Sequence, residues 1–186
     1  MSKKTAAPKK EAAAAVLEGQ QQATDAPQLA VLGQYVKDLS FENPNAPGSF
    51  QAKEPPKIDV AVDLRANRMA EEVFEIDLKF SAKALQGDKT SFVAEVVYTG
   101  LFGIKNVPEE QMEAVCLIEC PRMIFPFARR VLADTTRDGG FPPLMLDPID
   151  FVGLYQQRLA EREQKGEGAA AAAMPNPEAK DNGGAA

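Results

Sequence analysis

Histidine and tryptophan are absent from the 186-residue sequence, and cysteine occurs only twice. Histidine is the commonest general base and the commonest neutral metal ligand, so the residue most often used for either role is absent here. Cys116 and Cys120 are four residues apart in a helical pattern, which puts both on one helical face where a disulfide is unfavourable. Two thiolates without further ligands cannot complete a structural zinc site within one chain. We therefore expect buried free thiols in a reducing compartment.

Long apolar runs are also missing, so no segment is expected to cross a membrane. The apolar stretch Ala12–Leu17 is too short for a signal peptide, and Glu18–Gln22 follows it without a cleavage pattern. Lysine and arginine number 21 against 27 aspartates and glutamates, and the net charge of −6 argues against non-specific nucleic-acid binding. These features predict a cytoplasmic protein that neither inserts into a membrane nor binds nucleic acid.

No catalytic constellation can be assembled from the sequence. Gly100–Gly103 follows a predicted strand but lacks the spacing and the lysine of a nucleotide-binding loop. Without histidine, no serine, cysteine or threonine has its usual activating base. We expect no enzymatic activity, no cofactor and no metal. An enzyme that uses groove carboxylates is an alternative, and a strongly shifted carboxylate pKa in a pocket would be its sign.

Hydrophobic alternation predicts four strands, at residues 31–42, 57–66, 73–85 and 91–102. Gln86–Lys89 is a predicted hairpin turn, because glycine and aspartate tolerate the positive φ that such turns need. The third strand should therefore pair with the fourth. The second and third strands are joined by a short link, so they are also expected to pair. Val93 and Val97 make the second face of the fourth strand partly apolar, which indicates contact with another chain.

Alternation also assigns the faces of the first strand. The residues predicted to share its core face are Tyr35, Lys37, Leu39 and Phe41. The residues predicted to point into water are Asp38, Ser40 and Glu42. With Glu75, Asp77 and Glu95 of the later strands, this predicts an acidic outer face on the sheet. The ordinary alternative is a solvated surface without a partner.

Two helices are predicted after the strands. The first runs from Pro108 to about Thr135, and its internal Pro121 and Pro126 predict a kink or a break. The second covers 148 to about 162, with Asp147 as its cap and Pro148 at its first position. Its apolar stripe consists of Phe151, Val152, Tyr155 and Leu159.

Four strands followed by two helices predict an α+β fold, a four-stranded antiparallel sheet with two helices packed on one face. This core is thin, so we expect the protein to oligomerise through helix one and strand four. The domain is predicted at 29–162. The Lys/Ala/Pro/Gln-rich segment 1–28 and the Ala/Gly/Pro-rich segment 163–186 are predicted to be disordered tails.

Three short motifs combine proline and phenylalanine at close spacing. Lys37–Glu42 reads K-D-L-S-F-E and is followed by P-N-A-P at Pro44–Pro47. Cys120–Arg129 reads C-P-R-M-I-F-P-F-A-R, and Gly140–Leu144 reads G-F-P-P-L. In order and spacing, these motifs resemble the SecB family of protein-export chaperones over roughly residues 29 to 160. The resemblance implies an ATP-independent holdase that binds unfolded secretory preproteins and delivers them to the SecA ATPase.

The resemblance also implies residue roles. Docking of the C-terminal zinc-binding segment of SecA is implied for Asp38, Glu42, Val93 and Glu95. A peptide-binding groove between the crossover loop, a strand and the last helix is implied, and we assign to it Phe50, Phe127, Phe141 and Tyr155. A homotetramer, a dimer of dimers, is implied, with interface residues Ala94, Val96 and Tyr98. Family members often have Cys and Gln in place of Ala94 and Tyr98, so the dimer–dimer contact is expected to differ.

Two alternatives to the holdase stay open at this point. One is an acidic scaffold that binds a folded basic partner without chaperoning. The other is a homologue with a specialised client, such as a toxin–antitoxin system. Arrested refolding of a client distinguishes the holdase from the scaffold, because a scaffold would bind only the folded partner.

Overall fold

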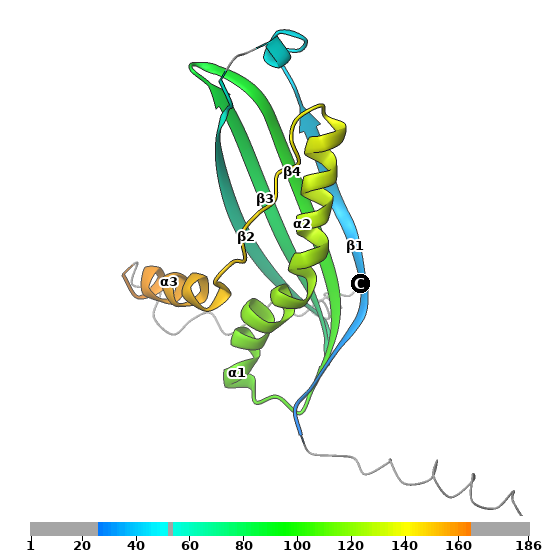
Figure 1. Ribbon diagram of the computed structural model, residues 1–186. Coiled ribbons are helices and arrows are strands. Elements are labelled where there is room, and N and C mark those ends of the chain that lie inside the picture. Colours follow the sequence, from blue (N-terminus) through cyan, green and yellow to red (C-terminus); the bar gives the residue numbers. More distant parts are fainter. Residues whose placement is uncertain (1–25, 52–53, 165–186) are drawn as a thin grey trace, which may run out of the picture.

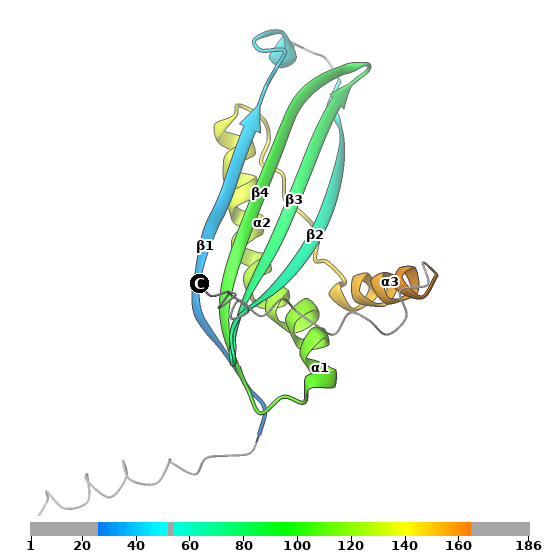
Figure 2. The ribbon, with the colours of Figure 1, turned by 180° about the vertical axis from the view of Figure 1, so that it is seen from behind.

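The computed structural model describes residues 26–51 and 54–164, which form one antiparallel sheet in the order β1-β4-β3-β2. The strands are β1 (Gln28–Glu42), β2 (Lys57–Ala70), β3 (Val73–Gln86) and β4 (Lys89–Lys105). Helices cover one face of the sheet, which we call the inner face (Figure 1). The opposite face, which we call the outer face, is not covered by helices in the view from behind (Figure 2). The predicted α+β class and the predicted pairing of the last three strands are confirmed.

The central strands follow the predicted alternation closely. On β3, alternate residues are completely buried, among them Phe74, Ile76, Leu78 and Phe80. Their neighbours face the outer side and are half-buried. The β3–β4 turn contains Gly87 at a φ of 56°, as the hairpin prediction requires. The main core therefore lies between the inner face of β3 and β4 and the helices above it.

β1 does not keep one alternation along its length. Its register with β4 shifts between Val36 and Asp38, where a β-bulge adds one residue. Tyr35 upstream of the bulge and Lys37 within it both reach the outer face and bind the Glu75 carboxylate of β3. Downstream, Phe41 stacks on a ring of the inner face. The prediction that all these residues share a core face was therefore wrong, because alternation cannot register an inserted residue.

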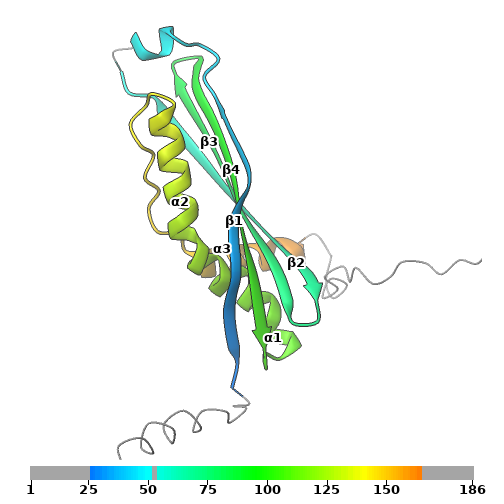
Figure 3. The same ribbon diagram turned by 90° about the vertical axis from the view of Figure 1, so that its right-hand side faces the viewer.

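The predicted first helix consists of three consecutive segments: α1 (Glu109–Ala114), the π-helical η2 (Val115–Glu119) and α2 (Cys120–Asp138). A kink or a break was predicted at Pro121 and Pro126, and the segments are in fact contiguous: the helical geometry changes directly before Pro121, which lies in the first turn of α2 after the π segment. Proline has no N–H for the regular helical bond, and a wider π turn precedes it. α2 continues through Pro126 and lies along the inner face of the sheet (Figure 3).

α3 (Phe151–Gln164) follows a coil and stands off the edge of the sheet formed by β2 (Figure 1). It begins later than predicted, and its cap is Asp150 rather than Asp147: the Asp150 Oδ1 accepts a hydrogen bond of 3.1 Å from the Gly153 N–H. The preceding coil stays non-helical while Leu144, Leu146 and Ile149 pack on the core.

Three contacts attach α3 to the rest of the fold, and one of them is a hydrogen bond of 3.0 Å from Arg158 Nη1 to the Leu64 carbonyl oxygen. Phe151 is buried against the Phe125 ring, with 6.1 Å between the ring centroids. Arg162 forms an ion pair of 2.7 Å with Glu113 of α1. The predicted tails lie almost entirely outside the described residues, although β1 already includes Gln28 and α3 extends past 162.

Candidate functional site

The outer face brings together the four residues assigned to partner docking. Glu42 lies directly opposite Val93 in the β1–β4 pairing, and Ser40 lies opposite Glu95. Asp38, on the same side of β1, lies opposite Val97. We call Asp38, Glu42, Val93 and Glu95 the outer strip. Three carboxylates around an apolar side chain form a surface that suits a cationic segment with some apolar character.

The carboxylates of the outer strip differ in their partners. Glu95 accepts hydrogen bonds from Lys79 Nζ at 3.2 Å and from Ser81 Oγ at 3.0 Å. These bonds, with the Lys79 bond as the larger cause, lower the pKa of Glu95. Within the described part of the chain, Asp38 and Glu42 have no ion pair and are exposed. Two of the three acids are therefore open to a partner.

Other acids of the outer face are neutralised within the protein. Lys37 Nζ lies 2.9 Å from Glu75 Oε2 and 3.0 Å from Asp77 Oδ2. Partial burial opposes the ionisation of Glu75, but hydrogen bonds from Lys37, Tyr35 and Asn67 outweigh it and lower its pKa. Thr99 Oγ1 donates to Asp77 at 2.6 Å. The predicted acidic face is thus partly neutralised within the protein, whereas Asp38 and Glu42 of the outer strip keep their charge unpaired in the described ranges.

A shallow hollow of about 280 Å³ crosses the outer face beside the strip. All four strands contribute to its lining, which consists of Lys37, Asp38, Asp63, Arg65, Asp77, Lys79 and Val97. Sequence reasoning missed this charged network, because it placed Lys37 on the opposite face. The alternation of acids and bases on β2 and β3 was its only sequence signal, and that pattern also suits an ordinary wet surface.

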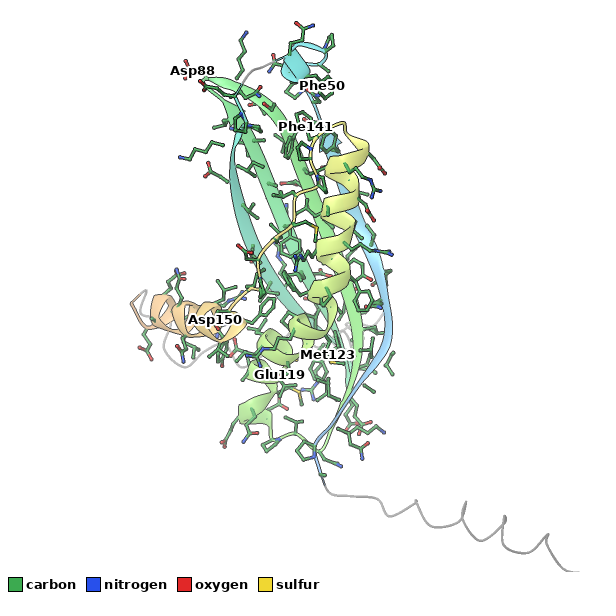
Figure 4. All side chains as sticks on the ribbon, in the orientation of Figure 1. Phe50, Asp88, Glu119, Met123, Phe141 and Asp150 are labelled. Atoms are coloured by element: carbon green, nitrogen blue, oxygen red, sulfur yellow. The ribbon has the colours of Figure 1, made fainter. Side chains whose placement is uncertain are left out.

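An aromatic cluster lies at the C-terminal end of α2. Its members are Phe41, Phe50, Phe92 and Phe141. Phe141 is central, with ring centroids 4.8 Å from Phe92 and 5.3 Å from Phe50. Phe50, in the 3₁₀ segment η1 (Gly48–Gln51), remains 51% exposed although it touches the buried Phe141 (Figure 4). Two of the assigned groove residues therefore meet here, and one presents its ring to solvent.

The other two assigned groove residues lie elsewhere. Phe127 is 45% exposed on α2, one turn from the exposed Met123. Tyr155 is on α3 and lines a hollow of about 350 Å³, which we call the α3 hollow. Its other lining residues are Val62, Asp63, Leu64, Leu117, Leu154, Gln157, Arg158 and Glu161. Burial, with a smaller contribution from Glu113, raises the pKa of Tyr155.

Ala94, Val96 and Tyr98, assigned to a subunit interface, are at most 8% exposed beneath the protein's own helices. In this arrangement these three side chains cannot contact another subunit directly. Exposed apolar side chains lie instead on the edge strand β1, where Leu32 is 56% and Leu39 is 47% exposed. An edge strand also has unpaired backbone groups, which favour contact with another chain.

The two cysteines are free and fully buried, and both contribute to the core between the helices and the sheet. The neighbouring Cys116, followed by burial, raises the pKa of the Cys120 thiol. Among the described residues, no group of three or more His, Cys, Asp or Glu side chains could hold a metal ion. No helix in the described ranges is long and apolar enough to span a membrane.

An open sheet with a charged strip on one face and half-exposed aromatic rings on the other defines a binding protein of the α+β class. The family model of preprotein translocase subunit SecB matches residues 21–162. Protein-export protein SecB of Parvibaculum lavamentivorans is 63% identical over 153 residues, which cover 82% of this chain and 89% of that protein. The Maricaulis maris protein of the same name is 54% identical, covering 87% and 90%.

The chain therefore belongs to the SecB family and is a protein-export chaperone rather than an enzyme. Among solved structures, it is similar in fold to a SecB-like chaperone of Mycobacterium tuberculosis in complex with an antitoxin peptide. The TM-score is 0.56 at 15% sequence identity, covering 66% of this chain and 91% of that one. The family resemblance inferred from the three motifs is confirmed.

Proposed function

We propose that the protein holds unfolded preproteins in the cytoplasm without nucleotide and transfers them to SecA. The half-exposed Phe50, held against the buried Phe141, carries this proposal. An unfolded chain exposes apolar side chains that a folded protein buries, and an aromatic ring offers them area without demanding one partner shape. Selectivity for slowly folding clients follows, because folding removes the segments that bind.

The client groove is proposed to run from the aromatic cluster to the α3 hollow. The coil between α2 and α3 connects these two places on the inner side of the sheet (Figures 1 and 4). Met145 in this coil is 57% exposed, and Tyr155 lines the hollow at its end. Flexible methionine and rigid aromatic side chains together suit binding to many sequences.

SecA docking is proposed for the outer strip, on the face away from the groove. Asp38 and Glu42 are exposed acids without an intramolecular ion pair in the described ranges, and Val93 supplies apolar area between the strands. A fixed acidic surface accelerates association with a cationic segment and makes binding sensitive to salt. Separate faces allow a client and SecA to be bound at the same time.

Self-association is proposed through β1 and α2 rather than through the buried side of β4. The exposed apolar residues that support this contact are Val31, Leu32, Val36, Leu39, Met123 and Phe127. Phe127 is thereby assigned to the subunit contact instead of the groove. A tetramer repeats the groove, so weak contacts to several segments of one client add through high effective concentration.

Refolding of a slow-folding preprotein in the absence of nucleotide tests the function. Arrest near one tetramer per client, which disappears when the client folds first, is the expected result. Phe50→Ser should weaken the arrest, whereas Asp59→Asn on the outer face should leave it unchanged. Absence of arrest at saturating concentration would refute the holdase, and binding to a folded basic partner would then favour the acidic scaffold.

A further inference from the structure

Lys79 has two acidic neighbours on the outer face, on opposite sides of β3. Its Nζ lies 3.2 Å from Glu95 Oε2, and both side chains are more than one-third exposed, at 38% and 37%. In the β2–β3 pairing, Lys79 lies directly opposite Asp63. Lys79 and Asp63 line the same hollow on this face. The lysine can therefore reach an acid on either neighbouring strand without leaving the sheet surface.

Glu95 is the member of the outer strip that is already occupied. Lys79 and Ser81 hold one carboxylate oxygen each, whereas Asp38 and Glu42 have no ion pair among residues 26–51 and 54–164. A cationic partner segment that reaches Glu95 meets Lys79 as a competitor of the same charge. Asp63 Oδ2 lies 3.4 Å from Arg65 Nε, and Asp63 Oδ1 accepts a hydrogen bond of 2.9 Å from the Leu64 N–H. The side chains of the Arg65–Asp63 ion pair are 74% and 54% exposed, so it is an exposed contact for which Lys79 can compete.

We propose that Lys79 is an internal competitor for the outer strip, which holds Glu95 in the free protein and moves to Asp63 when a cationic partner segment docks. This inference deepens the proposed SecA docking and rests on it. The exchange is feasible because exposed ion pairs contribute little net free energy and form and break readily. A lysine that changes partner avoids a repulsive contact with the incoming cation. Lys79 thereby limits affinity and favours segments with enough positive charge to displace it.

Lys83 provides a matched control for Lys79. It lies on the same face of β3, opposite Val93 of the outer strip and Asp59 of β2, and is exposed. Within the described residues, Lys83 forms no ion pair with Glu95. Replacing either lysine removes one positive charge beside the strip, so both changes alter long-range attraction similarly. Only the Lys79 change also releases Glu95.

The experiment measures binding of the zinc-loaded C-terminal segment of SecA to the full-length protein at low and physiological salt. Lys79→Met should tighten binding by about two- to fivefold and Lys83→Met by less than about twofold, as expected for one exposed ion pair. In a Glu95→Gln background, the extra gain of Lys79→Met should disappear. Asp63→Asn should weaken binding more when Lys79 is present than in the Lys79→Met protein.

Two failures can be told apart. Equal effects of Lys79→Met and Lys83→Met on affinity, or weaker binding by the Lys79→Met protein, would overturn the competitor role. If Glu95→Gln still reduces affinity in that case, docking at the outer strip itself stands. Binding that is independent of both Asp38 and Glu95, or no binding at all, would refute outer-strip docking and the competitor role with it. Thermal unfolding of each variant at equal protein concentration shows whether the fold is unchanged.

Discussion

Neighbouring residues of the same strands lie on different faces of the sheet and have different roles: those on the inner face are buried, and those on the outer face are charged and partly exposed. On the inner face of β3 every second side chain is buried, and Phe80 meets the Phe125 ring edge-on at 6.2 Å. On the outer face, Lys79 and Glu95 form an ion pair in which both side chains are more than one-third exposed, as the proposed exchange of partners requires. Burial therefore fixes one face, and the other face is free to meet a partner through charges that cost little to rearrange.

The contrast predicts where mutations affect stability and where they affect recognition. Apolar rings that lose all solvent contact contribute by burial and packing. Exposed ion pairs contribute to association rate and specificity far more than to folding. The aromatic cluster lies between these cases, because Phe141 is buried and Phe50 is half exposed.

The largest expected difference is between adjacent residues of β3. Phe80→Ala should lower the free energy of unfolding by about 3–5 kcal/mol, because a buried ring leaves a cavity. Lys79→Ala, one position earlier and on the outer face, should change it by less than about 1 kcal/mol. Urea unfolding at a fixed protein concentration measures both. Comparable losses would contradict the division of labour between the faces.

A smaller difference is expected within the aromatic cluster. Phe141→Ala should cost about 3 kcal/mol of stability, since its ring packs against three others. Phe50→Ala should cost about 1 kcal/mol or less and instead weaken binding of an unfolded client by about three- to tenfold. Unfolding curves and client-binding titrations separate the two effects. A Phe50→Ala protein with unchanged client affinity would remove this residue from the groove.

Single substitutions in the outer strip should have a smaller effect on SecA binding than Phe50→Ala has on client binding. Glu42→Gln and Asp38→Asn are each expected to reduce affinity for the SecA segment by about two- to fivefold, mainly through slower association at low salt. Asp59→Asn, on the outer face of the opposite edge strand, is the control for loss of one acid. Surface plasmon resonance at two salt concentrations measures the rates. Equal effects of all three changes would indicate general attraction rather than a defined site.

The inner face was predictable because one rule, alternation, governs it. On β3 the positions predicted to face the core are those that are buried. The family resemblance implied the residues of the outer strip, and the pairing of β1 with β4 brings these residues close together. Their role in docking stays a prediction.

Features that depend on inserted residues or on distant partners could not be predicted. The bulge in β1 leaves no mark in the hydrophobic pattern, so Lys37 was placed on the wrong face. The start of α3 is displaced because the coil before it packs on the core. Alternation indicates that Val96 and Tyr98 share one face of β4, but it does not specify that the protein's own helices, rather than another subunit, cover that face.

The network around the bulge supports the smallest prediction, which concerns pH. The pKa of Glu75 is lowered in the folded protein, so its contribution to stability is present above the unfolded value, near 4.5, and is lost as pH falls through the folded value. Glu75→Gln should therefore flatten the decline of stability with falling pH in that acidic range. Urea midpoints between neutral and acidic pH measure this, with Glu110→Gln on the exposed turn of α1 as the control.

The outcome also tests the contrast between the faces. Glu75 is only 13% exposed and binds Lys37 from across the bulge, which makes it the outer-face residue most like an inner-face one. If Glu75→Gln flattens the curve, this part of the outer face contributes to folding as well as to charge. If the curve keeps the wild-type shape, Lys37 and Glu75 form an exchangeable pair like Lys79 and Glu95, and the whole outer face is available for recognition.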